Sequence, residues 1–229
     1  MPVLEILTSS GFGSLLGMRH ALEPDHLAAV STLVSHERST IKAAWLGLCW
    51  GAGHTLALLV VGVVLVVLRA ELPASAATTF EFGVAVMLVA LGLRTIAQAA
   101  RQGQQGMDGP SWLHRHGWIL HQHPGAQPHV HIGKWTMARR PLVIGAIHGL
   151  AGSGALTALV LATLPSTAAR VAYMALFGVG SAIGMAALSG LLGWPLARLG
   201  AHHAVARGVT LLVGCLSTAL GAFWGYRLL

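Results

Sequence analysis

Six long apolar stretches separated by short polar segments form the pattern of this chain. They lie near residues 3–34, 43–68, 78–100, 140–164, 168–197 and 207–228. A helix needs about 20 mostly apolar residues to cross the hydrocarbon core of a bilayer, and each stretch reaches that length. The pattern therefore predicts an all-α, polytopic membrane protein with six transmembrane helices.

Composition supports a lipid bilayer as the surroundings of this chain. Of the 229 residues, 9% are charged and 55% are hydrophobic, whereas soluble domains carry about 25% charged residues. The 29 glycines suit helices that pack closely in a membrane. The formal net charge of +7 would indicate nucleic acid in a soluble chain, but in a membrane protein it reflects basic cytoplasmic loops. No nucleic-acid partner is expected.

Lysine and arginine are distributed unevenly between the two ends of the predicted helices. One side carries ten of them: Arg38, Lys42, Arg94, Arg101, Arg115, Lys134, Arg139, Arg140, Arg198 and Arg207. The other side carries three: Arg69, Arg170 and Arg227. Because cytoplasmic loops collect basic residues, we expect a protein of the cell (inner) membrane with both termini outside the cytoplasm.

The two halves of the chain contain similar segments. GMRHAL at 17–22 resembles GAIHGL at 145–150, and WGAGH at 50–54 resembles FGVGS at 177–181. Each half has three spans, so the second half must enter the membrane from the opposite face. This predicts a 3+3 inverted repeat with its substrate site near the midplane, although glycine-rich apolar helices can also match by chance. The predicted parts are residues 1–101, a His-rich cytoplasmic loop at 102–138, and residues 139–229.

Ionisable residues are concentrated in the first apolar stretch, where residues 19–26 read RHALEPDH. Each such group costs about 2.5 to 3.5 kcal/mol at the centre of a bilayer and so needs a reason. Two imidazoles and two carboxylates suit a divalent metal ion such as nickel, cobalt or zinc. These candidate ligands are His20, Glu23, Asp25 and His26. The alternative is a kinked structural helix with an Arg19 to Glu23 pair.

Pro24 predicts a break in the first helix. On a straight helix Asp25 would point away from the other candidate ligands. A proline inside a helix clashes with the carbonyl four residues back, here that of His20. We therefore expect a free carbonyl at His20 and a turn that lets Asp25 and His26 approach it.

Two more histidines lie in apolar surroundings, His54 in the second stretch and His148 in the fourth. A lone buried histidine is commonly a hydrogen-bonded core residue, but the neighbouring metal-ligand motif makes both candidate ligands. If the repeat is real, His20 and His148 face each other across a central cavity with His54 close by. A glycine-permitted irregularity is then expected around residues 152–154.

RHALEPDHLAA at residues 19–29 resembles the RHAxDADHI signature of the nickel/cobalt transporter family, also called NicO, and especially its UreH-like branch. Glu23, Pro24 and Leu27 replace the aspartate, alanine and isoleucine of that signature. The resemblance implies a nickel or cobalt permease in which His20, Asp25 and His26 handle the ion.

The chain also departs from the longer members of that family. They have eight spans and a second acidic motif, LGxDTATE, where this chain has GLAGSGAL at 149–156. Related efflux proteins have six spans, an HxLEPxH motif and a His-rich loop, so the direction of transport stays open. Asp25 favours uptake.

The predicted loop at 102–138 contains three His-x-His pairs: His114 with His116, His121 with His123, and His129 with His131. Residues i and i+2 of an extended chain project to the same side, so each pair can chelate one divalent ion. We interpret the loop as a metal-collecting tether that could serve a cytoplasmic metal acceptor. The alternative is a plain solvated linker.

These observations predict a membrane permease that imports nickel(II), or cobalt(II), as its transported substrate, with no prosthetic group. Efflux through the same site is the first alternative. An intramembrane metalloenzyme is the second, disfavoured because the sequence contains no HExxH motif. The sequence does not indicate an oligomeric state.

Overall fold

The structure is a computed structural model. It describes residues 12–35, 37, 39–70, 72–102, 112–116, 119–123, 129–132, 135–164, 166–199 and 203–229.

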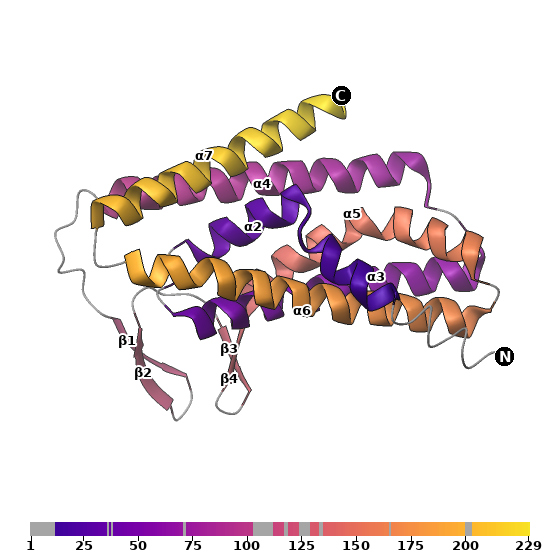
Figure 1. Ribbon diagram of the computed structural model, residues 1–229, viewed down its shortest axis with the longest axis horizontal. Coiled ribbons are helices and arrows are strands. Elements are labelled where there is room, and N and C mark those ends of the chain that lie inside the picture. The colour runs from indigo at the N-terminus through magenta and orange to yellow at the C-terminus, as the bar shows by residue number, and fades with distance from the viewer. Residues whose placement is uncertain are drawn as a thin grey trace.

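Long helices form an elongated bundle (Figure 1). They are α2 (Pro24–Val34), α3 (Thr40–Leu68), α4 (Ala74–Gln102), α5 (Arg139–Thr163), α6 (Thr167–Leu199) and α7 (His203–Arg227), and residues 12–20 are also helical. Four segments of the described chain are long and apolar enough to cross a membrane: Thr40–Leu68, Ala74–Arg101, Thr167–Pro195 and Ala204–Arg227. The predicted helical membrane protein is confirmed at this level.

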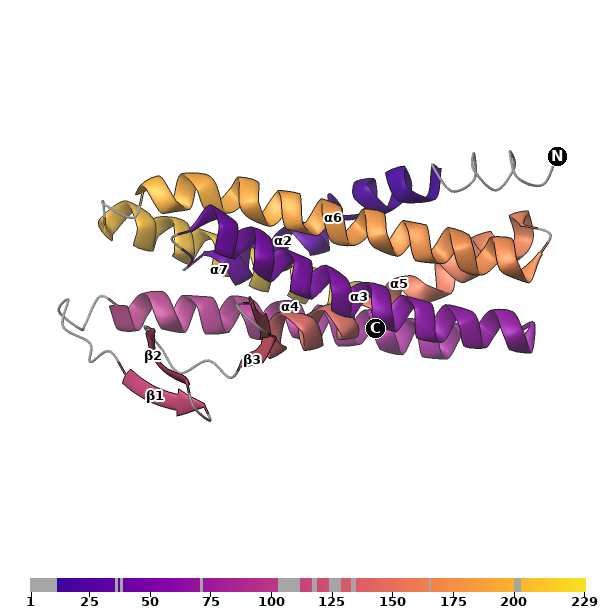
Figure 2. The same ribbon diagram turned by 90° about the horizontal axis from the view of Figure 1, so that it is seen from below.

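Two antiparallel β-hairpins lie beside one half of the bundle (Figure 2). The first pairs β1 (Trp112–His116) with β2 (Ile119–His123), and the second pairs β3 (His129–Ile132) with β4 (Trp135–Ala138). Both fall in the predicted His-rich loop, for which composition indicated no packed core. The all-α prediction therefore holds for the bundle but not for this loop.

The first predicted span is divided immediately before Pro24. Residues 21–23 separate the helical segment 12–20 from α2, and Glu23 is extended at φ −64° and ψ 148°. Pro24 opens α2, a position where its missing N–H costs no hydrogen bond. The predicted break is confirmed. The predicted free carbonyl is wrong, because the backbone N–H of Glu23 donates to the His20 carbonyl at 3.0 Å.

Glycines bring α3 close to α5 and α6. A Cβ at Gly145 of α5 would collide with the Trp50 carbonyl of α3, and one at Gly51 would lie 2.5 Å from the Ala182 Cα of α6. Gly51 of α3 contacts Ala182 of α6, and Thr55, one turn later in α3, contacts Gly178, one turn earlier in α6. The two helices are therefore antiparallel.

Helices α4 and α7 form a second antiparallel pair. Gly92 lies against Gly214, and Gly221 lies against Ala85. Ser217 of α7 donates a hydrogen bond to the Leu88 carbonyl at 3.0 Å. Helix α2 contacts both this pair and α6, so the residues just after the break lie inside the bundle.

Helix α5 runs without interruption from Arg139 to Thr163. The predicted irregularity around residues 152–154 is therefore wrong. The glycines upstream instead serve close approach: Gly145 packs on the Trp50 carbonyl and Gly149 on the His54 carbonyl. Backbone contact of this kind needs small residues and no helix break.

Candidate metal centre

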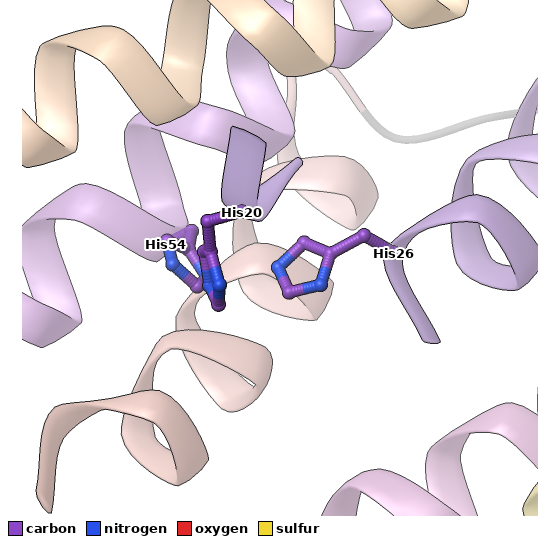
Figure 3. A group of neighbouring side chains, drawn as sticks. All are labelled: His20, His26 and His54. Carbon is purple, nitrogen blue, oxygen red and sulfur yellow. The ribbon is translucent and has the colours of Figure 1, made fainter. Parts of the chain in front are cut away.

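The two parts of the broken first span and two further helices, α3 and α5, supply the histidines of one buried cluster. His20 ends the helical segment 12–20, and His26 lies in the first turn of α2. His54 comes from the middle of α3 and His148 from α5. Figure 3 shows the rings of His20, His26 and His54 pointing toward one another. The break before Pro24 makes this convergence possible, because His20 and Asp25 belong to different helices.

The histidine rings lie close enough together for nitrogens of three of them to bind the same metal ion. The His26 ring centroid is 4.4 Å from that of His20, 5.3 Å from that of His54 and 4.1 Å from that of His148. His20 and His54 are 5.3 Å apart. One nitrogen from each of His20, His26 and His54 lies within 4.8 Å of the other two. This spacing matches three ligands around one metal ion.

Asp25 connects two of the histidines. Its Oδ2 is 2.6 Å from His148 Nε2, and its Oδ1 is 3.1 Å from His26 Nδ1. An ionised carboxylate only accepts hydrogen bonds, so both ring nitrogens must donate. The other nitrogen of each neutral ring then carries a lone pair. Asp25 thereby sets which nitrogen of His26 and of His148 can bind a metal ion.

Several ring nitrogens in the cluster are buried and have no hydrogen-bond partner among the described residues. They are His20 Nε2, His26 Nε2, His148 Nδ1 and both nitrogens of His54. A buried polar atom without a partner is costly, so these positions need an explanation. A bound divalent ion would use their lone pairs, since imidazole nitrogen is a preferred ligand of nickel and cobalt.

Glu23 marks the exposed edge of the cluster. Its Oε1 is 3.0 Å from His20 Nδ1, and the side chains of Glu23 and His20 are 54% and 16% exposed. The predicted alternative of an Arg19 to Glu23 pair is therefore replaced by a pair with His20. His26 and His54, by contrast, are 1% and 0% exposed. Exposure thus falls steadily from Glu23 inward.

Two aromatic side chains flank the histidines, and the sequence interpretation missed their role. The Trp50 ring lies 5.4 Å from His26 and 5.6 Å from His148, and the Phe177 ring lies 5.3 Å from His20. Both begin the similar segments 50–54 and 177–181. This shared first position was the sequence signal that could have indicated a common role for the two aromatic residues.

A family profile described as "NicO: High-affinity nickel-transport protein" matches residues 7–212. The chain belongs to the NicO family. This membership confirms the predicted resemblance and assigns the chain, in general terms, to nickel transport across a membrane.

The curated relatives include one of nearly the same length. The urease accessory protein UreH of Bacillus sp. (strain TB-90) is 29% identical over 228 residues, which cover 100% of this chain and 95% of the relative. Two chloroplast proteins of Arabidopsis thaliana, FOR GROWTH AND FERTILITY 2 and 1, are 27% and 30% identical over 82% of this chain. The chain spans 48% and 50% of their lengths. No solved structure matches this chain.

Proposed function

We propose that this NicO chain is a permease that imports nickel(II), and also cobalt(II), through the site formed by His20, Asp25, His26, His54 and His148. The observation that carries the proposal is the set of buried ring nitrogens without hydrogen-bond partners around one carboxylate. Glu23 lies at the exposed edge and receives the hydrated ion.

The chemistry of the site suits a dehydrated divalent ion. Nickel and cobalt bind neutral imidazole well, while the carboxylate of Asp25 offsets part of the charge. Metal binding requires unprotonated rings, so protons and metal ions compete for the site. An ion that moves from Glu23 and His20 to His26, His54 and His148 replaces its waters by nitrogen ligands one at a time.

An inverted repeat supports passage through the bundle. Gly17 packs on the Phe177 carbonyl, and Gly145 packs on the Trp50 carbonyl. These two contacts are related by the same offsets, 128 and 127, as the similar segments at 17–22 and 145–150 and at 50–54 and 177–181. The repeats proposed are residues 1–101 and 139–229.

A second pair of contacts obeys the same relation. Gly180 packs on the Ser14 carbonyl, and Gly53 packs on the Leu142 carbonyl. Helices α3 and α6 start at Thr40 and Thr167, again 127 positions apart, and they run antiparallel. Antiparallel mates are what a repeat of opposite membrane orientation requires.

Orientation and direction follow from charge and from the signature. Ten basic residues against three favour a cytoplasmic position for the loop at 102–138 and external termini in the inner membrane. Asp25 occupies the aspartate position of the importer signature that this segment resembles, which favours uptake.

The His-rich loop at 102–138 fits a cytoplasmic station that passes the ion to a metal acceptor. In the β1–β2 ladder, His114 is the register partner of His121, and His116 and His123 lie two positions away on their strands. Positions two apart share a face of a ladder. The register therefore aligns the two His-x-His segments of this hairpin across one ladder.

Accumulation of radioactive nickel tests the proposal. Cells that lack other nickel transporters should accumulate nickel when they produce the wild-type chain, and excess cobalt should compete more strongly than zinc. Loss of nickel from preloaded cells would instead identify an efflux protein. Accumulation without chemical turnover would distinguish a permease from a metalloenzyme.

A further inference from the structure

The two aromatic residues beside the histidine cluster occupy matched positions on antiparallel helices. Trp50 is ten residues after the start of α3 at Thr40, and Phe177 is ten residues after the start of α6 at Thr167. Because α3 and α6 run in opposite directions, the two residues approach the cluster from opposite ends of the bundle.

The packing of α3 against α6 fixes their separation. Gly178 meets Thr55 and Ala182 meets Gly51, so Phe177 lies near the level of residue 56 on α3. Trp50 and Phe177 are thus about six residues apart along the helix axis, or about 9 Å at 1.5 Å per residue. His54 and Ser181 lie between these two levels.

Both aromatic rings contact the histidine rings directly. Trp50 is 0% exposed and packs on His26 and His148, while Phe177 is 7% exposed and packs on His20. Each residue's carbonyl also touches a glycine of the facing helix, Gly145 for Trp50 and Gly17 for Phe177. A movement between the helices would therefore displace the ring and the backbone together.

We propose that Trp50 and Phe177 are paired gates of the metal site, Trp50 toward the loop between the first span and α3, and Phe177 toward the loop between α5 and α6. This inference rests on the proposed transport function. A large apolar ring blocks a hydrated ion, so passage requires the two gates to open in turn.

The two gates differ in how tightly they close. His20, whose side chain is 16% exposed, contacts Phe177, whereas Trp50 covers two rings that are 1% and 2% exposed, those of His26 and His148. The described structure is therefore closed more tightly at Trp50, as expected for a site that opens to one side at a time.

Side-specific labelling tests the gates. Ser181 is fully buried between them, and Ser181→Cys in a Cys49→Ser, Cys215→Ser background provides one thiol. An impermeant thiol reagent is applied without metal to right-side-out and to inverted vesicles. Phe177→Ala should raise the labelling rate about tenfold from the α5–α6 loop face only, and Trp50→Ala about tenfold from the opposite face only.

Matched controls use aromatic residues away from the cluster. Trp194→Ala in α6 and Phe223→Ala in α7 remove rings that are 51% and 60% exposed, and they should leave both labelling rates unchanged. Equal acceleration from both faces, or no acceleration by either gate variant, would overturn the proposal.

A flux measurement tests the gates independently if the Ser181→Cys variant does not fold. In vesicles, Trp50→Ala with Phe177→Ala should equilibrate nickel at a rate linear in concentration, whereas the wild type saturates. Saturation with an unchanged KM would overturn the gates. Nickel binding by the purified wild type separates this outcome from failure of the proposed function, which predicts binding that His26→Ala abolishes.

Discussion

The carboxylate of Asp25 lies 2.6 Å from His148 Nε2 although 123 positions separate them in the chain. Both side chains are buried, at 6% and 2% exposure. The contact joins the first turn of α2 to α5, so one carboxylate links the two halves of the chain. It also leaves His148 Nδ1 as the nitrogen that is free to bind a metal ion.

Asp25→Asn should weaken nickel binding by about 10- to 100-fold, the range for loss of a residue that orients a metal ligand. An amide offers one accepting oxygen and one donating nitrogen, so it cannot accept from His26 and from His148 through both atoms. Titration calorimetry of the purified protein measures the affinity. Asp25→Glu serves as the charge-preserving comparison, and an unchanged affinity in the asparagine variant would show that Asp25 does not orient these rings.

His26→Ala should abolish nickel accumulation while the protein stays in the membrane. Its ring is the centre of the cluster, with centroids of three other histidine rings within 5.3 Å. Membrane yield by immunoblot accompanies each uptake assay. His203→Ala, at the start of α7, is the matched control and should accumulate nickel normally. Wild-type accumulation by His26→Ala would remove the transport site from the first span.

Glu23→Asp should be milder than Glu23→Gln. Glu23 is half exposed and pairs with His20 at 3.0 Å, so its carboxylate acts where the ion still holds water. The shorter acid keeps the charge, and the importer signature carries aspartate at this position. Initial uptake rates at low nickel concentration provide the comparison. Normal uptake by Glu23→Gln together with a loss in Glu23→Asp would show that the length of the side chain, and not its charge, is what matters.

Sequence patterns predicted the break and the candidate ligands for identifiable reasons. Proline restricts the backbone locally, so Pro24 alone predicted where the first span divides. His54 and His148 became candidate ligands because they lie in apolar stretches of a chain whose first span carries a metal-ligand motif. The hydrogen bond between Asp25 and His148 could be recognised only in the tertiary fold, since no local pattern specifies a partner 123 positions away.

Three details were not available from local patterns. The prediction of a free carbonyl at His20 was wrong because the turn at residues 21–23 supplies a new donor, the backbone N–H of Glu23. Glu23 pairs with His20, whereas the alternative considered from the sequence paired it with Arg19. Trp50 and Phe177 were read only as repeat positions, because an aromatic residue in an apolar helix carries no signal of what it covers.

The predicted orientation can be tested by labelling Gly125→Cys in a Cys49→Ser, Cys215→Ser background. The excess of basic residues predicts a cytoplasmic position for the loop at 102–138, so an impermeant thiol reagent should label this cysteine only after cells are permeabilised. A cysteine appended after Leu229 should be labelled in intact cells. The opposite pattern would invert the proposed orientation.

Substitutions at glycine test whether the two halves pack by the same rule. A Cβ at Gly17 would collide with the Phe177 carbonyl, and one at Gly145 with the Trp50 carbonyl. Helices in a bilayer depend on such close contact, so Gly17→Leu and Gly145→Leu should lower the yield of folded protein to a similar extent. Gly83→Leu is the control, because nothing lies within 4 Å of a Cβ at that position. Yield after detergent extraction and size-exclusion chromatography is the measurement. If only one of the two variants loses yield while Gly83→Leu does not, the contacts are not equivalent, and the inverted repeat loses the packing relation that supports it.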